Sequence, residues 1–211
     1  MKSLILSTFL ASSLLAAASA DAPPESTANT LRMTVRVYNY AKISDGVLRK
    51  AKRQSDRIFS GVGIETSWLD CPISPELIPL NRSCSARPGP EDLILKLLPK
   101  SMSKKYGFKT GIFGFALVPG HTINLFFARV LDLAYYGNVG ADFRDAQAII
   151  LGHMIVHEIG HSLLGPNSHA ASGVMDFPWD KRVLTNMERG RLKFTREEEL
   201  KIRKELERRV G

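Results

Sequence analysis

The sequence predicts an α+β fold in a single domain spanning residues 31–211, and three observations support this. Residues 31–37 alternate strictly between apolar and polar side chains, which is typical of a half-buried strand. Two later segments, residues 145–164 and 195–209, have helix signals at their ends. Several short apolar runs lie between the first strand and these helices. The chain of 211 residues is 44% hydrophobic, which is ordinary for one globular domain with its own core.

The first twenty residues have the pattern of a secretory signal peptide. Lys2 precedes an apolar run over residues 4–17, and the small residues 18–20, Ala-Ser-Ala, form a cleavage site. The run is short for a membrane span, and no later segment has ~18 uninterrupted apolar residues. We therefore expect a secreted or periplasmic protein with no membrane span after cleavage, an uncleaved anchor being the alternative. Residues 21–30 are expected to be a flexible lead-in.

The elements that follow the first strand are predicted from periodicity and turn residues. Residues 45–59 have apolar side chains at helical spacing with cationic residues between them, and Gly61 and Gly63 end this amphipathic helix. Residues 64–69 predict a second strand. The further strand candidates are the apolar runs at residues 93–98, 111–118 and 122–130, with a Pro-Gly turn between the last two.

A helix is also predicted at the end of the chain. It begins at Thr195, whose hydroxyl can cap the first turn while the Glu198 side chain returns the bond. It continues to about residue 209, and we expect Leu200 and Leu206 to face the core.

The helix predicted over residues 145–164, which Gly165 closes, carries the candidate chemistry. Residues four apart share one helix face, so His157 and His161 can present their imidazoles to one metal ion. Glu158 is turned about 100° from His157 and can flank the ion without binding it. Three protein ligands with one open position are typical of catalytic zinc, where a glutamate accepts the proton of the attacking water. Histidine and glutamate rarely lie in so apolar a helix without partners, which disfavours a merely decorative role.

A third ligand is needed, and three residues are candidates. We prefer His169, because Gly165 can reverse the chain and bring residues just beyond the helix back under the ion. Asp176 is the alternative. His153 lies one turn before His157, but three ligands along one straight helix would be spread over about 12 Å. They cannot all reach an ion at ~2 Å, so His153 is expected to support the site or pack near it.

Residues 156–179 resemble the metzincin clan of zinc peptidases, especially its matrixin-like branch. Those enzymes share H-E-x-x-H-x-x-G-x-x-H followed by a Met-turn. The run S-G-V-M is similar to that turn, and Met175 follows His161 by fourteen residues, as in matrixins. Most of the remaining chain resembles a group of uncharacterised exported bacterial proteins with similar H-E-I-G-H and N-S-H runs.

The chain departs from the family pattern at the third ligand. The family's glycine would fall at Leu164 and its third histidine at Asn167, whereas this chain has Gly165 and His169. The resemblance implies a zincin-like fold, in which a mixed twisted sheet accompanies an active-site helix and a C-terminal helix. It also implies Zn²⁺ as cofactor and Met175 as an apolar floor beneath the ligand histidines. Peptide substrates of the family bind along an edge strand, for which residues 111–118 are the candidate.

The only two cysteines, Cys71 and Cys84, are expected to form a disulfide, because exported proteins mature in an oxidising compartment. The bridge would pin a proline-containing loop and contribute roughly 3 kcal/mol. A metal role is weaker, since no close C-x-x-C pair is present, and free thiols are the remaining alternative.

The net charge of +8 comes largely from dispersed Lys and Arg. The sequence lacks the basic face interleaved with stacking aromatics that nucleic-acid binding requires. We interpret the charged residues as a solvated surface that favours acidic substrates or anionic envelopes. The sequence therefore predicts a monomeric zinc metalloendopeptidase-like hydrolase acting on peptide or protein substrates, with Glu158 as general base. The alternatives are a zinc hydrolase of a non-protein amide and a non-catalytic zinc-containing binding module.

Overall fold

The computed structural model describes residues 30–105, 112–117, 121–137, 139–140 and 142–211. The expected signal peptide lies outside the described residues, as does the expected lead-in apart from its last residue, Thr30. Within the described residues, no helix is long and apolar enough to cross a membrane.

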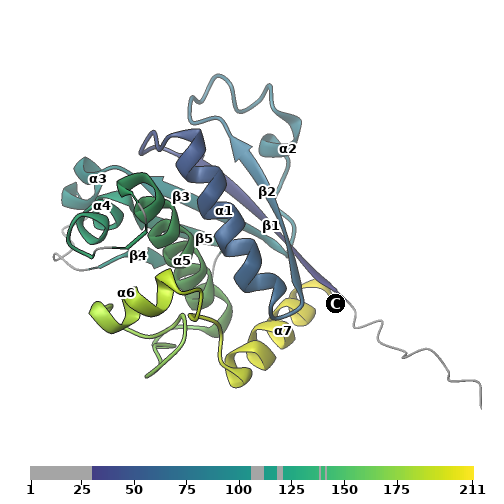
Figure 1. Ribbon diagram of the computed structural model, residues 1–211. Helices are drawn as coiled ribbons and strands as arrows, with labels where there is room; N and C mark the ends of the chain where they lie inside the picture. The colour runs from purple at the N-terminus through teal and green to yellow at the C-terminus, as the bar shows by residue number, and fades with distance from the viewer. Residues whose placement is uncertain (1–29, 106–111, 118–120, 138, 141) are drawn as a thin grey trace, which may run out of the picture.

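The described strands form one five-stranded mixed sheet in the order β2-β1-β3-β5-β4 (Figure 1). The first four strands in this order pair in parallel, and β4 pairs antiparallel to β5 at one edge. The strand bounds are β1 Leu31–Asn39, β2 Ile64–Cys71, β3 Asp92–Leu98, β4 Gly114–Ala116 and β5 Thr122–Phe126. The prediction of a mixed sheet accompanied by helices is confirmed.

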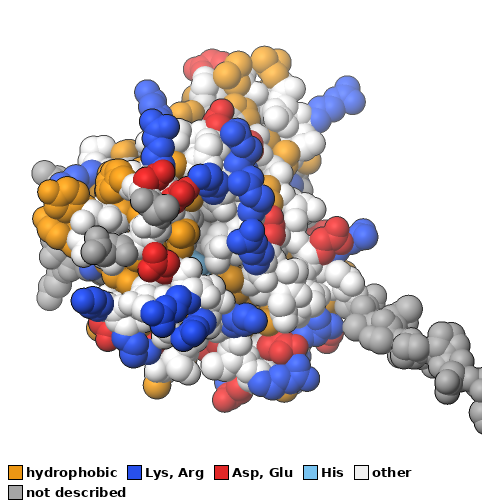
Figure 2. Space-filling view, in the orientation of Figure 1, with side chains coloured by type: hydrophobic (Ala, Val, Ile, Leu, Met, Phe, Trp, Pro, Cys, Tyr) orange, Lys and Arg blue, Asp and Glu red, His pale blue; other side chains and the backbone are white. Residues whose placement is uncertain are grey.

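Two helices, α1 (Asp45–Ser60) and α5 (Phe143–Leu164), lie side by side on one face of the sheet (Figure 1). They approach closely at Gly152, where a Cβ atom would lie 2.7 Å from the Ala51 carbonyl oxygen. The Ser55 hydroxyl of α1 donates to the Gly152 carbonyl oxygen at 3.0 Å. The outer face of α1 carries Lys and Arg, which gather along it in Figure 2. This close contact fixes α5, and with it the histidines, against the sheet.

The remaining helices are shorter or lie toward the C-terminus. Their bounds are α2 Arg82–Ser85, α3 Lys100–Lys105, α4 Phe127–Tyr136, α6 Lys181–Glu188 and α7 Arg196–Val210. The capping box that the sequence predicts for α7 is present: the Thr195 hydroxyl accepts from the Glu198 backbone N–H, and the Glu198 carboxylate accepts from that of Thr195.

The strand predicted over residues 122–130 is wrong in its second half. The structure ends β5 at Phe126 and begins α4 at Phe127, with no turn residue between them. Buried Val130, Leu133 and Ala134 are spaced three and four apart, which is the helical repeat. The neighbouring prediction over residues 111–118 reduces to the short strand β4, and its two end residues lie outside the described part of the chain.

The prediction that Leu200 faces the core is also wrong. Leu200 is 54% exposed, whereas Ile202 and Leu206 are buried. Because successive residues turn by about 100° around a helix, Leu200 lies about 200° from Ile202 and faces solvent. The buried face of α7 therefore runs through Ile202 and Leu206.

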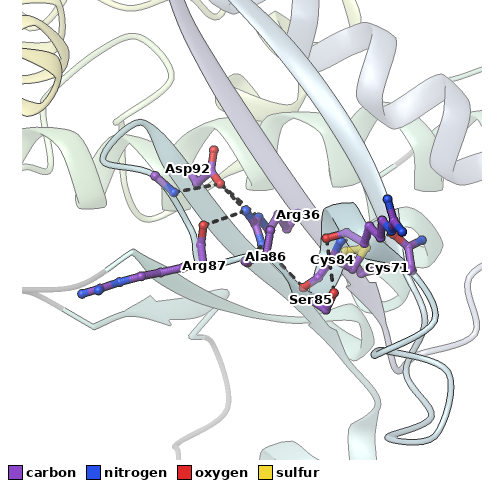
Figure 3. Close-up of polar contacts among 10 residues, drawn as sticks. Arg36, Cys71, Cys84, Ser85, Ala86, Arg87 and Asp92 are labelled. Carbon is purple, nitrogen blue, oxygen red and sulfur yellow. Dashed lines mark hydrogen bonds and ion pairs between the residues drawn. A yellow bond between two sulfur atoms is a disulfide. The ribbon is translucent and has the colours of Figure 1, made fainter.

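The segment between β2 and β3 is fastened by two interactions (Figure 3). A disulfide joins Cys71, the last residue of β2, to Cys84 in α2, with the two Cα atoms 5.6 Å apart. Arg36 of β1 is buried and pairs with buried Asp92 of β3 through Nε at 3.0 Å and Nη2 at 2.6 Å. Its Nη1 also donates to the Ala86 carbonyl oxygen at 2.6 Å. The guanidinium thus ties this segment to the centre of the sheet.

Candidate metal centre

Two of the predicted ligands, His157 and His161, lie on helix α5, which is largely buried. It begins at Phe143, two residues before the predicted start, because the Asp142 carboxylate accepts a hydrogen bond from the Asp145 backbone N–H at 2.8 Å. His157 is buried and His161 is half-buried, one turn apart on the same helix face. A buried helix holds both imidazoles in place before any ligand arrives.

The chain reverses direction directly after α5, which brings the third histidine back. Gly165 has φ of 93°, in the region that favours glycine, and Asn167 has φ of 59°. The Gly165 N–H still closes the helix by donating to the His161 carbonyl oxygen at 3.1 Å. His169 therefore lies beside the two helical histidines, at the position preferred from the sequence.

The three histidines converge on one point. The His161 Nε2 atom lies 3.1 Å from His157 Nε2 and 3.1 Å from His169 Nε2, and the three candidate ligand atoms all lie within 4.8 Å of one another. Two nitrogens bound tetrahedrally to one zinc ion at 2.0–2.1 Å would be about 3.3 Å apart. The donor set and its spacing therefore fit a zinc ion with three protein ligands.

Hydrogen bonds at the opposite ring nitrogens orient two of these imidazoles. His157 Nδ1 lies 2.9 Å from the Val174 carbonyl oxygen, to which it donates. His161 Nδ1 lies 2.9 Å from the Ser168 hydroxyl. A partner at Nδ1 fixes the tautomer and turns Nε2 toward the metal position, as is usual for histidine ligands.

Burial keeps the histidines neutral. It lowers the pKa of His157 to about 3 and the pKa of His161 to about 4, and it also lowers the pKa of the more exposed His169. Neutral imidazole is the form that binds a metal. Burial likewise raises the pKa of Glu158 to about 8, and a nearby dication would favour its ionised form.

A pocket of about 430 Å³ opens over the histidines and Glu158. One wall is β4: a Cβ atom on Gly114 would overlap the Asn124 carbonyl oxygen and would also lie 3.1 Å from the Glu158 Cδ atom, so a glycine is needed at this position. The other lining residues are mostly apolar and include Ile112, Phe113, Phe115, Ala116, Pro166 and Phe177. Glu158 thus lines the same pocket as the three histidines and lies against the edge strand of the described sheet.

Met175 lies fully buried beneath α5. Gly160 makes room for it, because a Cβ atom at that position would overlap the Met175 sulfur. The turn that carries Met175 is held by the Val174 N–H, which donates to the Lys193 carbonyl oxygen at 2.9 Å. Met175 therefore packs against the stretch of α5 that lies between the two ligand histidines.

The other two candidate ligands are engaged elsewhere. Asp176 is buried and accepts a hydrogen bond from Arg182 at 2.7 Å, so its carboxylate is neutralised by a cation of α6. His153 is buried between α1 and α5, where its Nδ1 lies 2.8 Å from the Ile149 carbonyl oxygen. Its Nε2 lies 3.5 Å from the Gln54 side-chain nitrogen. Neither residue belongs to the histidine group.

Sequence reasoning missed the side chains and carbonyls that support the ligands. The Ser168 hydroxyl could have been suspected from its place beside His169 in the N-S-H run. The Val174 carbonyl leaves no signal in side-chain identity, because any residue supplies one. The contact of the Phe113 ring with His157, at 5.6 Å between centroids, joins residues distant in the sequence and has no local pattern.

No family model matches this chain, and no curated protein matches it. Among solved structures, its fold is similar to that of a zinc-dependent peptidase from Methanocorpusculum labreanum. The TM-score is 0.53 and the sequence identity 16%, and the match covers 80% of this chain and 99% of that chain. An archaemetzincin from Methanopyrus kandleri has a TM-score of 0.47 and 16% identity, over 83% of this chain and 96% of that one. The chain therefore has a zinc metallopeptidase fold, and within it lies a three-histidine group suited to zinc.

Proposed function

We propose that this chain is an exported zinc-dependent metallopeptidase of the matrixin-like type, with Glu158 as its general base. The observation that carries the proposal is the convergence of three histidine Nε2 atoms beside a buried glutamate, in a pocket bordered by an edge strand. A catalytic zinc site has three protein ligands and one open position, which this donor set matches.

The residues around the metal position have separate roles. When bound, zinc supplies a Lewis acid that polarises a carbonyl and acidifies water. Glu158 accepts a proton from the attacking water and returns it to the leaving nitrogen as the peptide bond breaks. Its apolar surroundings strengthen these charge interactions. The ligand histidines are neutral, so they leave the positive charge on the ion undiminished.

The edge strand offers a place for the substrate backbone. The Phe126 N–H donates to the Phe113 carbonyl oxygen, and the Leu117 N–H donates to the Thr122 carbonyl oxygen. The backbone groups of Phe113 and Leu117 therefore point toward β5. Because antiparallel pairing alternates, Gly114 and Ala116 direct their backbone groups away from β5. An extended peptide can pair with these backbone groups of β4 as a further strand, which would bring the carbonyl of the peptide bond to be cleaved next to Glu158.

The export part of the proposal rests on the N-terminal sequence and on the disulfide. The Cys71–Cys84 bridge would be stable in an oxidising compartment, whereas disulfides are rare in the cytosol.

We further propose that the protein acts as a monomer on peptide or protein substrates and binds no nucleic acid. A structural zinc site normally has four protein ligands, whereas the metal-binding group among the described residues has three, which disfavours the non-catalytic module.

Removal of the metal tests the proposed activity. We expect the protein lacking residues 1–20 to cleave members of a peptide library, to lose this activity when zinc is chelated, and to regain it with added zinc. The reason is that Glu158 alone cannot activate water for amide hydrolysis at a useful rate. Cleavage is followed by mass spectrometry. Undiminished cleavage by the zinc-free protein would contradict the proposal, and hydrolysis of small amides without any peptide cleavage would favour the non-protein substrate.

A further inference from the structure

His169 is the least supported of the three histidines. It lies in a turn beyond α5 and is exposed, whereas His157 is buried and His161 half-buried. Its two neighbours have hydrogen-bond partners at Nδ1, namely the Val174 carbonyl oxygen and the Ser168 hydroxyl. Within the described part of the chain, the hydrogen bonds show no such partner for His169 Nδ1. Some other contact must hold its ring if the site is formed before the metal binds.

That contact is the ring of Phe177. The rings of His169 and Phe177 are 4.6 Å apart between centroids and nearly parallel, with 11° between their planes. Such stacking restricts rotation of the imidazole about its side-chain bonds. The backbone supports the same placement, because the Ala170 N–H donates to the Met175 carbonyl oxygen at 3.0 Å and brings the two segments together.

Phe177 is itself held by the core. Its ring and the ring of Phe113 pack in a T-shaped arrangement, with 5.4 Å between the ring centroids and 81° between the ring planes. Phe113 is buried and packs against Trp179 at 4.3 Å and against His157 at 5.6 Å. A chain of aromatic contacts therefore connects the exposed ligand His169 to the buried ligand His157.

We propose that Phe177 is a positioning residue for the third zinc ligand, replacing by stacking the hydrogen bond that orients the other two histidines. This inference rests on the proposed zinc site. Loss of a residue that orients a metal ligand typically weakens metal binding by 10- to 100-fold. We expect removal of the ring to fall at the lower end of this range, a loss of about 10-fold in zinc affinity.

Phe177 also lines the pocket and is 37% exposed, so a role in substrate contact must be separated from positioning. A residue that only touches substrate would change KM and leave zinc affinity unchanged. Zinc affinity, measured without substrate, is therefore the deciding quantity.

The test compares zinc dissociation constants, obtained by competition with a chromophoric chelator, for the wild type and for Phe177→Leu, Phe177→Trp and Phe115→Ala. We expect Phe177→Leu to bind zinc about 10-fold more weakly, and Phe177→Trp, which keeps an aromatic face, to stay close to the wild type. Phe115 lines the same pocket but packs on Phe126, at 6.1 Å between centroids, and its replacement should leave zinc affinity unchanged. Thermal unfolding of the zinc-free proteins checks that each variant folds.

A double-mutant cycle with His169→Ala then shows whether Phe177 acts through His169. Because His169→Ala is expected to lose its zinc on purification, the cycle follows the residual zinc affinity of His157 and His161 by titration against a weaker chelator. In this background, Phe177→Leu should cause no further loss of zinc affinity. Wild-type affinity in Phe177→Leu, or an equal loss with and without His169, would overturn the positioning role. A wild type that binds zinc tightly but cleaves no peptide would contradict only the proposed peptidase function. Absence of zinc binding by the wild type would overturn both.

Discussion

Replacement of Glu158 by glutamine is expected to lower kcat/KM for peptide cleavage by about 10²–10⁴-fold while zinc stays bound. Glutamine has nearly the same shape, but its amide cannot accept the proton of the attacking water. Glu158 also lies outside the three-histidine ligand group, so the metal should be retained. Its carboxyl group borders the pocket at Gly114, where a neutral isostere should fit without displacing β4.

The measurement is steady-state cleavage of one identified peptide, with zinc content determined on the same samples. Glu197→Gln is a matched control, because Glu197 pairs with Lys201 on the exposed surface of α7. It should leave both quantities unchanged. Full activity in Glu158→Gln would eliminate the general-base role, and loss of zinc would show that the glutamate binds or shapes the metal site.

Replacement of Asp92 by alanine is expected to lower the free energy of unfolding by about 3–5 kcal/mol. The change leaves the buried Arg36 guanidinium without its carboxylate, and an uncompensated buried charge is strongly destabilising. Asp92 also accepts a hydrogen bond from the Gly89 N–H at 3.1 Å, so the segment fastened by the disulfide would loosen as well. Figure 3 shows these contacts around Arg36.

Equilibrium denaturation by urea measures this effect. Glu65→Ala provides the control on the neighbouring strand, because it breaks the Arg32–Glu65 pair, which is exposed, and should cost only about 0–1 kcal/mol. The pair variant Arg36→Met with Asp92→Leu should recover much of the stability lost by Asp92→Ala, since it removes both charges. Equal effects of the buried and exposed changes would contradict this account of the sheet.

The local part of the fold could be predicted from the sequence, because its signals lie within a few residues of each other. Alternation over residues 31–37 predicted β1, and the capping box at Thr195 predicted the start of α7. The boundary between β5 and α4 could not be found, because Phe126 and Phe127 are both apolar and neither is a turn signal. Strand order and the Arg36–Asp92 pair, whose residues are 56 positions apart, depend on contacts between distant parts of the chain, for which one sequence has no pattern.

The candidate site was predictable to the extent that a helix repeat and a chain reversal determine it. The four-residue spacing of His157 and His161 placed both on one face, and Gly165 made the return of His169 plausible. The grouping of His169, rather than Asp176, with the helical histidines could not be predicted, because the Arg182 contact that Asp176 makes lies in a helix that was not predicted. The stacking of Phe177 on His169, from which we propose its positioning role, depends on ring geometry that the sequence pattern does not show.

The central claim is that His157, His161 and His169 together hold one catalytic zinc ion. Its most direct test is the zinc content of the purified protein beside that of His169→Ala, with peptide cleavage measured on both. The account predicts about one zinc per chain and cleavage for the wild type, and loss of both in the variant. Stoichiometric zinc retained by His169→Ala would contradict it, because another residue would then complete the site.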